Sequence, residues 1–211
     1  MAATVARNGL RVLLGVLIVA ALAVTSTAKA GLIGTGSASY CDPTSSKNFA
    51  AYGDYANYAS LFNSGFESSS TGWSLSGSAR VVSGNEPAHI SGNARDSHSL
   101  LLPSGSSAYS STVCFAFGDW HLRFFAKNVG SSSGDLRVQV IVPSLLGILT
   151  ILDGGTVSAG GTWAPSPRVE LALCNVTSLL GTRAVAFRFT PVGYGAAFQI
   201  DDIYLDPWKD T

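Results

Sequence analysis

The segment Phe198–Leu205 reads FQIDDIYL, with two adjacent aspartates inside an otherwise apolar run of strand length. The segment Asn63–Trp73 reads NSGFESSSTGW and carries the isolated carboxylate of Glu67 directly after Gly-Phe. A buried carboxylate is costly unless it is hydrogen-bonded, paired or bound to metal. If the two segments form neighbouring strands, Glu67 and Asp201 or Asp202 can share one cation. The alternative is that these acids bind arginine side chains or strand-end amides.

Short runs rich in Val, Ile, Leu and Phe recur from about Leu61 onward, and Gly, Ser and Pro clusters separate them. Apolar and polar residues alternate in several runs, and this period of two is typical of a half-buried strand. The spacing predicts an all-β sandwich or barrel. The expected strands are Ala79–Ser83, Ser97–Leu102, Ser110–Phe117, Trp120–Lys127, Leu136–Val142, Ile148–Asp153, Arg168–Leu173, Arg183–Thr190 and Ala197–Asp206.

Residues 1–30 have the pattern of a secretory signal peptide. Arg7 and Arg11 precede the apolar run Val12–Val24, which is too short to span a bilayer comfortably, and Ala28–Ala30 offers a cleavage site after Ala30. The alternative is an uncleaved anchor. Cleavage removes three of the 13 basic residues and none of the 13 acidic ones. No basic run remains, which argues against a nucleic-acid partner, and no second apolar span follows.

Residues 31–60 are rich in Gly, Ser, Ala and Tyr, and we expect them to form a loosely ordered lead-in to a β-sandwich domain over residues 61–208. Export permits a disulfide, and three cysteines leave one thiol over. We favour Cys41–Cys114, because Cys114 lies in a strand-like run and Cys41 in a segment that would gain from being tied down. Cys174 is then a buried free thiol.

The order of several motifs resembles the galactose-binding-like jelly rolls, which include many carbohydrate-binding modules of secreted glycosidases. These motifs are NSGFE at 63–67, GW at 72–73, SLLLP at 99–103 and IDDI at 200–203. The resemblance covers about residues 61–207 and implies an antiparallel two-sheet jelly-roll sandwich. A set of secreted actinobacterial proteins is also similar, with GNEP at 84–87, LRFFA at 122–126 and FRFTP at 187–191. The resemblance is weakly specific for ligand, because one fold serves unrelated tasks.

The resemblance also implies a structural calcium ion, as in many carbohydrate-binding modules of this fold. Its ligands would be Glu67 and one or both of Asp201 and Asp202, completed by main-chain carbonyls around residues 93–98. Calcium takes six to eight oxygen ligands, and mixed carboxylates and carbonyls suit it. Because Asp201 and Asp202 are adjacent in a strand, we expect their side chains to diverge.

A polar, cationic face with one aromatic ring is expected opposite the apolar stripes, provided that the strands concerned adjoin. Arginine forks bind carboxylate and hydroxyl-rich groups well, so an acidic glycan or cell-wall polymer would suit this face. The alternative is an ordinary solvated surface. Trp120 and Tyr194 lie beside turns and are further candidates for stacking on a sugar. The residues of the expected face are Arg123, Phe125, Arg137, Gln139 and Arg188.

Catalysis finds little support in the sequence. Ser97 and His98 are adjacent and should point to opposite faces of a strand, whereas triads are recognised by geometry. Glycoside cleavage would need two carboxylates across a cleft. The sequence therefore predicts a secreted, non-catalytic module that binds carbohydrate or a cell-envelope glycan. The alternative is a structural or protein-interaction subunit of the cell surface, which should show an exposed apolar patch or an open sheet edge.

Overall fold

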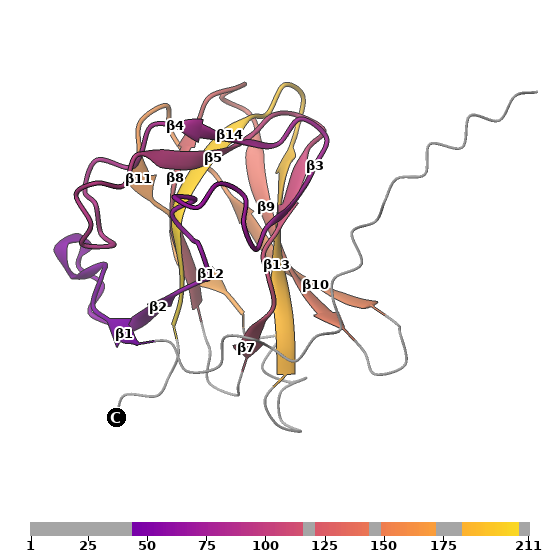
Figure 1. The fold of residues 1–211 in the computed structure, drawn as a ribbon. Helices are drawn as coiled ribbons and strands as arrows, with labels where there is room; N and C mark the ends of the chain where they lie inside the picture. The colour runs from indigo at the N-terminus through magenta and orange to yellow at the C-terminus, as the bar shows by residue number, and fades with distance from the viewer. Residues whose placement is uncertain (1–43, 116–120, 144–148, 172–182, 207–211) are drawn as a thin grey trace, which may run out of the picture. The chain divides into compact units, whose positions relative to one another are not determined.

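The computed structural model describes residues 44–115, 121–143, 149–171 and 183–206. Within these ranges the chain forms two antiparallel β-sheets, and a single 3₁₀ turn at Ala50–Tyr52 is the only helical element (Figure 1). No helix of the described residues has the length and apolar character needed to cross a membrane. The prediction of an all-β, antiparallel two-sheet sandwich is confirmed.

The first sheet, sheet A, is built around the C-terminal strand β14 (Phe198–Leu205). One edge of β14 pairs with β8 (His121–Asn128), and the other edge pairs first with β5 (His98–Leu102) and then with β2 (Tyr58–Ser60). Shorter strands flank these neighbours. They are β1 (Ser45–Ser46) beside β2, β4 (Arg80–Ser83) beside β5, and β11 (Ala164–Pro165) and β12 (Val169–Glu170) beside β8.

The second sheet, sheet B, is built around β13 (Arg183–Val192). One edge of β13 pairs with β9 (Asp135–Pro143), and β10 (Leu149–Val157) lies beyond β9. The other edge of β13 pairs with β6 (Ser107–Tyr109) and β7 (Val113–Phe115), and β3 (Ser74–Ser76) lies beyond β6.

The chain passes repeatedly from one sheet to the other. It enters sheet B after β2, β5, β8 and β12 and returns to sheet A after β3, β7, β10 and β13, so that strands distant in sequence become neighbours within each sheet. This alternation between two packed sheets is the pattern of a jelly roll. The jelly-roll sandwich predicted from the sequence is confirmed.

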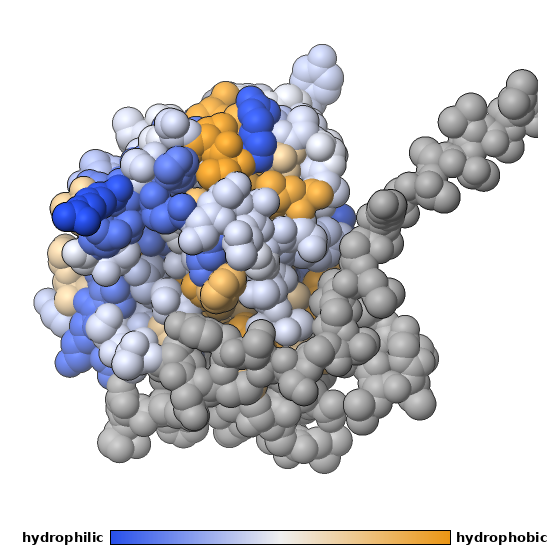
Figure 2. All heavy atoms as spheres, viewed as in Figure 1, coloured by the Kyte–Doolittle hydropathy of each residue, from blue (hydrophilic) through white to orange (hydrophobic). Residues whose placement is uncertain are grey.

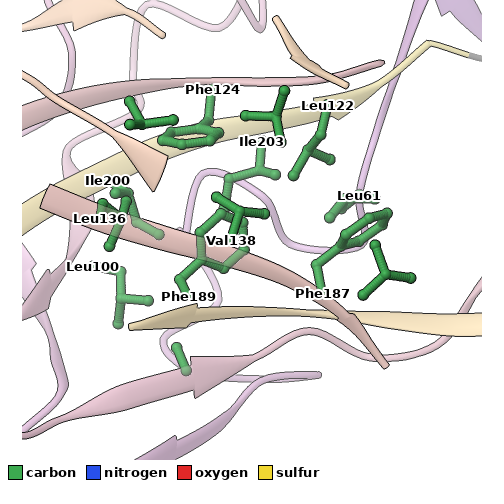
Figure 3. Packing of buried hydrophobic residues seen from close by; sticks show 14 of the residues in the cluster. Leu61, Leu100, Leu122, Phe124, Leu136, Val138, Phe187, Phe189, Ile200 and Ile203 are labelled. Carbon is green, nitrogen blue, oxygen red and sulfur yellow. The ribbon is translucent and has the colours of Figure 1, made fainter. Parts of the chain in front are cut away.

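The core lies between the two sheets, and the alternating side chains of the long strands supply it. Val138 in β9 and Phe187 and Phe189 in β13 point inward and are fully buried (Figure 3). From sheet A, Phe124 meets Phe189 edge to face, with 5.4 Å between the ring centroids. Such a pair adds about 0.5–1.5 kcal/mol to the stability that burial provides.

Residues 44–60 pack on sheet A: β1 and β2 extend the sheet at one edge, and the chain between them covers part of its outer face. The loosely ordered lead-in expected for residues 31–60 stays a prediction. Phe49 and Tyr58 from residues 44–60 are buried against Phe125 and Tyr204, which project outward from sheet A. Burial of a large aromatic side chain contributes roughly 1.5–3 kcal/mol, which explains why the segment packs down. Residues 31–43 lie outside the described ranges.

Candidate functional site

The side chains of Asp201 and Asp202 converge, and the prediction that they diverge is wrong. The pairing of β14 with β8 shifts register between Asp201 and Tyr204, and Asp202 has a φ of 48°. The extra residue is a β-bulge, which breaks the alternation of side chains along a strand. A Cβ atom added at Gly65 would lie 3.3 Å from Asp202 Oδ1 and 3.8 Å from Asp201 Oδ1. Both carboxylates therefore face the Gly-Phe-Glu segment.

Glu86 joins this pair, and nothing but its place in the GNEP motif indicates such a role in the sequence. Its main-chain N–H donates to Asp201 Oδ2 at 3.0 Å. Its own carboxylate accepts hydrogen bonds from the main-chain N–H groups of Ala88 and Ile90. Glu86, Asp201 and Asp202 are buried, and no ion pair among the described residues includes any of the three.

The buried acids of this cluster lack a counter-charge. Burial, followed by the charge of Asp202, raises the pKa of Asp201 to about 9. Burial, followed by the charge of Glu86, raises the pKa of Asp202 to about 7. In addition, Asp202 Oδ2 is buried without a hydrogen-bond partner. Near neutral pH the cluster therefore has to hold either protons or a cation.

The donor chemistry of the cluster fits a hard cation, since carboxylate oxygens are the ligands that calcium prefers. In the part of the chain that the structure describes, no three His, Cys, Asp or Glu side chains are arranged as a complete metal site. Main-chain oxygens and water would have to supply the remaining ligands of an ion placed at Asp202 Oδ2.

Glu67 binds strand-end amides, which is the alternative interpretation of this residue. Its Oε1 accepts from the main-chain N–H groups of Ser97 and His98, both at 2.7 Å, and its Oε2 lies 2.9 Å from His98 Nδ1. Partial burial opposes the shift, but the hydrogen bonds from His98 and the main chain lower the pKa of Glu67. Its role as a metal ligand stays a prediction.

The expected polar face does not exist as one surface, because its residues belong to different sheets. Arg123 and Phe125 lie in β8 of sheet A, whereas Arg137, Gln139 and Arg188 lie in β9 and β13 of sheet B. All five point away from the core, and so the two groups face opposite sides of the sandwich. The sequence pattern gave the orientation of each strand but not the sheet to which it belongs.

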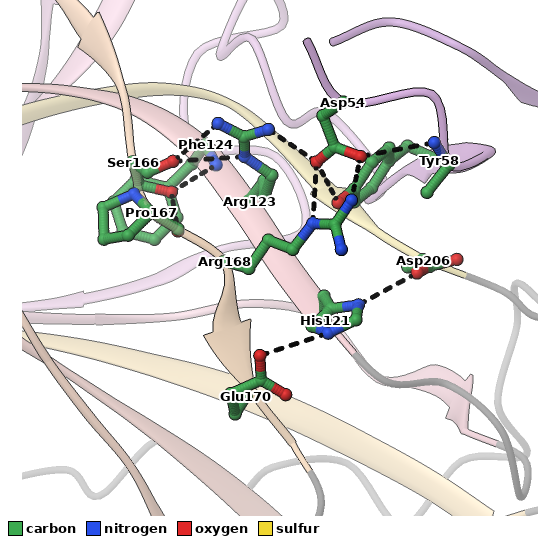
Figure 4. Close-up of polar contacts among 11 residues, drawn as sticks. Asp54, Tyr58, His121, Arg123, Phe124, Ser166, Pro167, Arg168, Glu170 and Asp206 are labelled. Atoms are coloured by element: carbon green, nitrogen blue, oxygen red, sulfur yellow. Dashed lines mark hydrogen bonds and ion pairs between the residues drawn. The ribbon is translucent and has the colours of Figure 1, made fainter. Parts of the chain in front are cut away.

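Arg123 is committed to contacts within the protein (Figure 4). Its Nη1 donates to Asp54 Oδ2 at 2.6 Å, and its Nε and Nη2 donate to the main-chain oxygen of Ser166 at 3.1 and 2.9 Å. The guanidinium group lies 4.5 Å from the centre of the Phe49 ring. Arg123 is 8% exposed and Phe125 is 2% exposed. Both side chains are therefore buried beneath residues of the segment 44–60, and neither is accessible to a ligand in this structure. Their role in binding stays a prediction.

Asp54 is the centre of this network. Its carboxylate accepts from the Tyr58 hydroxyl at 2.8 Å and pairs with Arg168 as well as with Arg123. Burial alone would raise the pKa of Asp54, but hydrogen bonds from Arg168, Tyr58 and Arg123 hold it well below its usual range. The network fastens the N-terminal cover to β8 and to the chain before β12.

The outer face of sheet B brings together the other three predicted ligand residues. Gln139 lies opposite Arg188, which lies opposite Tyr109 in β6, and Arg137 lies opposite Thr190. The Arg188 guanidinium lies 5.2 Å from the centre of the Tyr109 ring. Arg188 Nε and Thr190 Oγ1 are buried without a hydrogen-bond partner. We call these five residues (Tyr109, Arg137, Gln139, Arg188 and Thr190) the sheet-B face.

The histidines of the described chain do not form a hydrolytic relay. Ser97 Oγ and Glu67 Oε2 both approach the same nitrogen of His98, Nδ1, whereas a triad uses both ring nitrogens. The ring nitrogens of His121 face Asp206 at 3.1 Å and Glu170 at 3.2 Å, both carboxylates (Figure 4). No described hydroxyl or thiol completes a nucleophilic site with His121.

Several predictions fall on residues that the structure does not describe. Trp120, Cys41 and Cys174 lie outside the described ranges, and Cys114 lies in β7. The signal peptide, the Cys41–Cys114 pairing and the role of Trp120 therefore stay predictions. Tyr194 is described and is 97% exposed in the turn between β13 and β14. It is accessible to a ligand and follows β13, which ends at Val192.

No protein-family model and no curated protein matches the chain. Similar solved structures include carbohydrate-binding modules. The CBM22-1 xylan-binding domain of Paenibacillus barcinonensis Xyn10C is 15% identical with a TM-score of 0.47, covering 70% of this chain and 93% of that domain. TmCBM61, solved with β-1,4-galactotriose, is 18% identical with a TM-score of 0.42, and the match covers 69% of this chain and 95% of that module. The C-terminal family 22 module of Clostridium thermocellum Xyn10B is 14% identical with a TM-score of 0.44, and the match covers 72% of this chain and 96% of that module. At this level of similarity the neighbours identify neither a family nor a ligand for this chain.

Proposed function

We propose that this protein is a secreted, non-catalytic module that binds carbohydrate through the sheet-B face. The observation that carries the proposal is the pair of buried, unpartnered polar atoms on that face, Arg188 Nε and Thr190 Oγ1. A buried polar group without a partner costs about 1–3 kcal/mol. A sugar would satisfy both atoms, because its hydroxyl groups donate and accept hydrogen bonds.

The neighbouring groups suit the rest of a sugar ring. Tyr109 offers an aromatic ring, and the Gln139 amide offers two donors and an acceptor beside it. Small-molecule sites commonly combine such apolar and aromatic surfaces with a few fixed polar groups. The cation–π contact between Arg188 and Tyr109 holds both side chains in place before a ligand arrives.

A structural calcium ion is the second part of the proposal. Asp201 and Asp202 would hold it, with main-chain carbonyls near residues 93–98 and water completing the coordination. The unpartnered Asp202 Oδ2 supports this assignment. The ion would neutralise the buried carboxylates. It would thereby stabilise the contact between β14 and the loop that contains Glu86. Glu67 already accepts hydrogen bonds from Ser97 and His98 and would contribute only if one of its oxygens also reached the ion.

Isothermal titration with soluble xylan, galactan and mixed-linkage glucan, each for the wild type and for Tyr109→Ala, tests the carbohydrate site. We expect Tyr109→Ala to weaken binding about tenfold or more, the loss typical of an interface hot spot. Tyr55→Ala is the matched control, because Tyr55 is 69% exposed on the cover of the opposite sheet. A loss on Tyr194→Ala with Tyr109→Ala unchanged would move the site to the β13–β14 turn. Absence of binding to every polymer would overturn the proposal.

The alternative, a structural or protein-interaction subunit, is favoured by an open sheet edge. Among the described strands β10 pairs only with β9, and Ile151 in β10 is exposed. Figure 2 also shows one apolar region bordered by hydrophilic residues on the face in view. However, a register shift between Asp153 and Gly155 interrupts the β10 edge, and such bulges hinder edge-to-edge pairing. Light scattering that shows concentration-dependent assembly would favour this alternative.

A further inference from the structure

The sheet-B face carries two arginines that form no ion pair with a described acid. Arg188 lies opposite Gln139, and Arg137 lies opposite Thr190, so the two arginines are diagonal neighbours on adjacent strands. Diagonal neighbours on one face lie roughly 7–8 Å apart, and like charges in such positions repel. No ion pair among the described residues includes Arg137 or Arg188.

The acidic side chains that border this face are engaged locally. Asp153 in β10 lies opposite Gln139, and its Oδ1 accepts from the main-chain N–H of Gly155 at 3.1 Å. Asp135, at the beginning of β9, accepts from the Ser158 hydroxyl. The two aspartates formally balance the two arginines, but neither acid forms an ion pair with Arg137 or Arg188, so both guanidinium groups can still pair with an anionic ligand.

We propose that the polymer bound at the sheet-B face is an acidic polysaccharide, recognised through the carboxylate of a uronic acid. This inference rests on the proposed carbohydrate function and names the class of sugar. A guanidinium group binds a carboxylate side-on through Nε and one Nη, in two parallel charge-assisted hydrogen bonds. Arg188 Nε is the nitrogen that this geometry requires, and it is buried without a partner.

Tyr109 fixes the orientation that the fork needs. The Arg188 guanidinium lies over the Tyr109 ring, which occupies one of its flat faces, and its Nε atom has no hydrogen-bond partner. Arg137 is exposed and adds a second positive charge that attracts an anion and weakens as salt rises. In this proposal Arg188 therefore forms the directional hydrogen bonds to the carboxylate, and Arg137 contributes mainly long-range electrostatic attraction.

The experiment compares four polymers: polygalacturonate, its fully methyl-esterified form, β-1,4-galactan and a sulfated galactan. We expect polygalacturonate to bind at least about tenfold more tightly than the two uncharged polymers at low salt, the effect of about one charge-assisted hydrogen bond. Arg188→Lys, which keeps the charge but removes the fork, should abolish most of this preference, because it should weaken polygalacturonate binding much more than galactan binding. Arg137→Gln should weaken polygalacturonate less and reduce its dependence on salt.

Arg80→Gln is the matched control for the loss of one charge, because Arg80 is exposed in β4 of sheet A. It should leave all four affinities unchanged, and melting temperatures should show that every variant is folded. Equal binding of galactan and polygalacturonate, with Arg188→Lys weakening both, would overturn the acidic preference while the carbohydrate function stands. Binding of the sulfated polymer alone would overturn recognition of a carboxylate. Binding of none would overturn both proposals.

Discussion

Substitution of Asp54 tests whether the N-terminal cover is fastened as the structure indicates. Asp54→Asn would weaken the contacts of one carboxylate with Arg123, Arg168 and Tyr58. Breaking a buried ion pair costs about 3–5 kcal/mol, because the remaining charge stays buried without compensation. Arg123 still donates two hydrogen bonds to the Ser166 carbonyl, so we expect the lower part of this range, about 3 kcal/mol.

Arg168→Gln is the control, since it breaks the more exposed pair with the same aspartate. The Arg168 side chain is 43% exposed, and exposed pairs contribute only about 0–1 kcal/mol. Urea unfolding at pH 7 measures both variants, and a shifted midpoint with an unchanged slope reports stability alone. Equal and small losses for Asp54→Asn and Arg168→Gln, below about 1 kcal/mol, would refute a buried Asp54–Arg123 pair.

The contribution of the Asp54–Arg123 pair to stability should depend on pH in a defined direction. The pKa of Asp54 is lowered in the folded protein, so its contribution is present above the unfolded-state pKa of 3.8. The contribution is lost as the pH falls from 3.8 toward the folded-state pKa. The stability difference between the wild type and Asp54→Asn should therefore shrink progressively in acid, as measured by urea unfolding at a series of pH values. A difference that does not change with pH would contradict this assignment.

Further predictions concern the acidic cluster and the core. With chelator present, the melting temperature should fall as the pH rises from about 4 to 9. The reason is that the pKa values of Asp201 and Asp202 are raised in the folded protein, so that deprotonation destabilises the fold. Added calcium should reverse the fall, and identical curves with calcium and with chelator would count against the ion. Gly65→Ala should remove part of the stabilisation by calcium, since its Cβ would crowd Asp202, whereas Gly160→Ala, with no atom within 4 Å, should be neutral in the same assay. Phe189→Ala should cost about 3–5 kcal/mol in urea unfolding, as expected for a fully buried aromatic side chain, and a loss below 1 kcal/mol would contradict the core packing.

The long strands were predictable because alternation persists along them. The expected strands Leu136–Val142 and Ala197–Asp206 differ from β9 and β14 by a residue at each end. Short strands carry too few residues for a period to emerge, and β1, β2, β3 and β11 were missed. The expected strand Ser110–Phe117 corresponds only in part to β7, whose neighbour β6 ends at Tyr109.

The candidate sites were predictable only where they depend on neighbouring strands of known orientation. Arg137, Gln139 and Arg188 come together because β9 and β13 pair directly. Tyr109 was missed because nothing in the sequence shows that β6 pairs with β13. Thr190 was not selected, although it alternates with Arg188 along the same strand. The convergence of Asp201 and Asp202 depends on a bulge and a positive φ, neither of which alternation can indicate. Glu86 reaches them through a loop whose path no periodic pattern describes.

Which face of the sandwich can bind a polymer depends on the N-terminal segment. Outward-facing residues of sheet A, such as Phe125 and Arg123, have the aromatic and cationic character expected of a sugar site. Within the chain, the Phe49 ring stacks on Phe125 and the Asp54 carboxylate pairs with Arg123. On sheet B the arginines and the tyrosine have no such intramolecular partner among the described residues, apart from their contact with one another. On sheet A, the arginine Arg123 thus pairs with a carboxylate of the protein itself, that of Asp54. On sheet B, we propose that the carboxylate of an acidic glycan takes the same role toward Arg188.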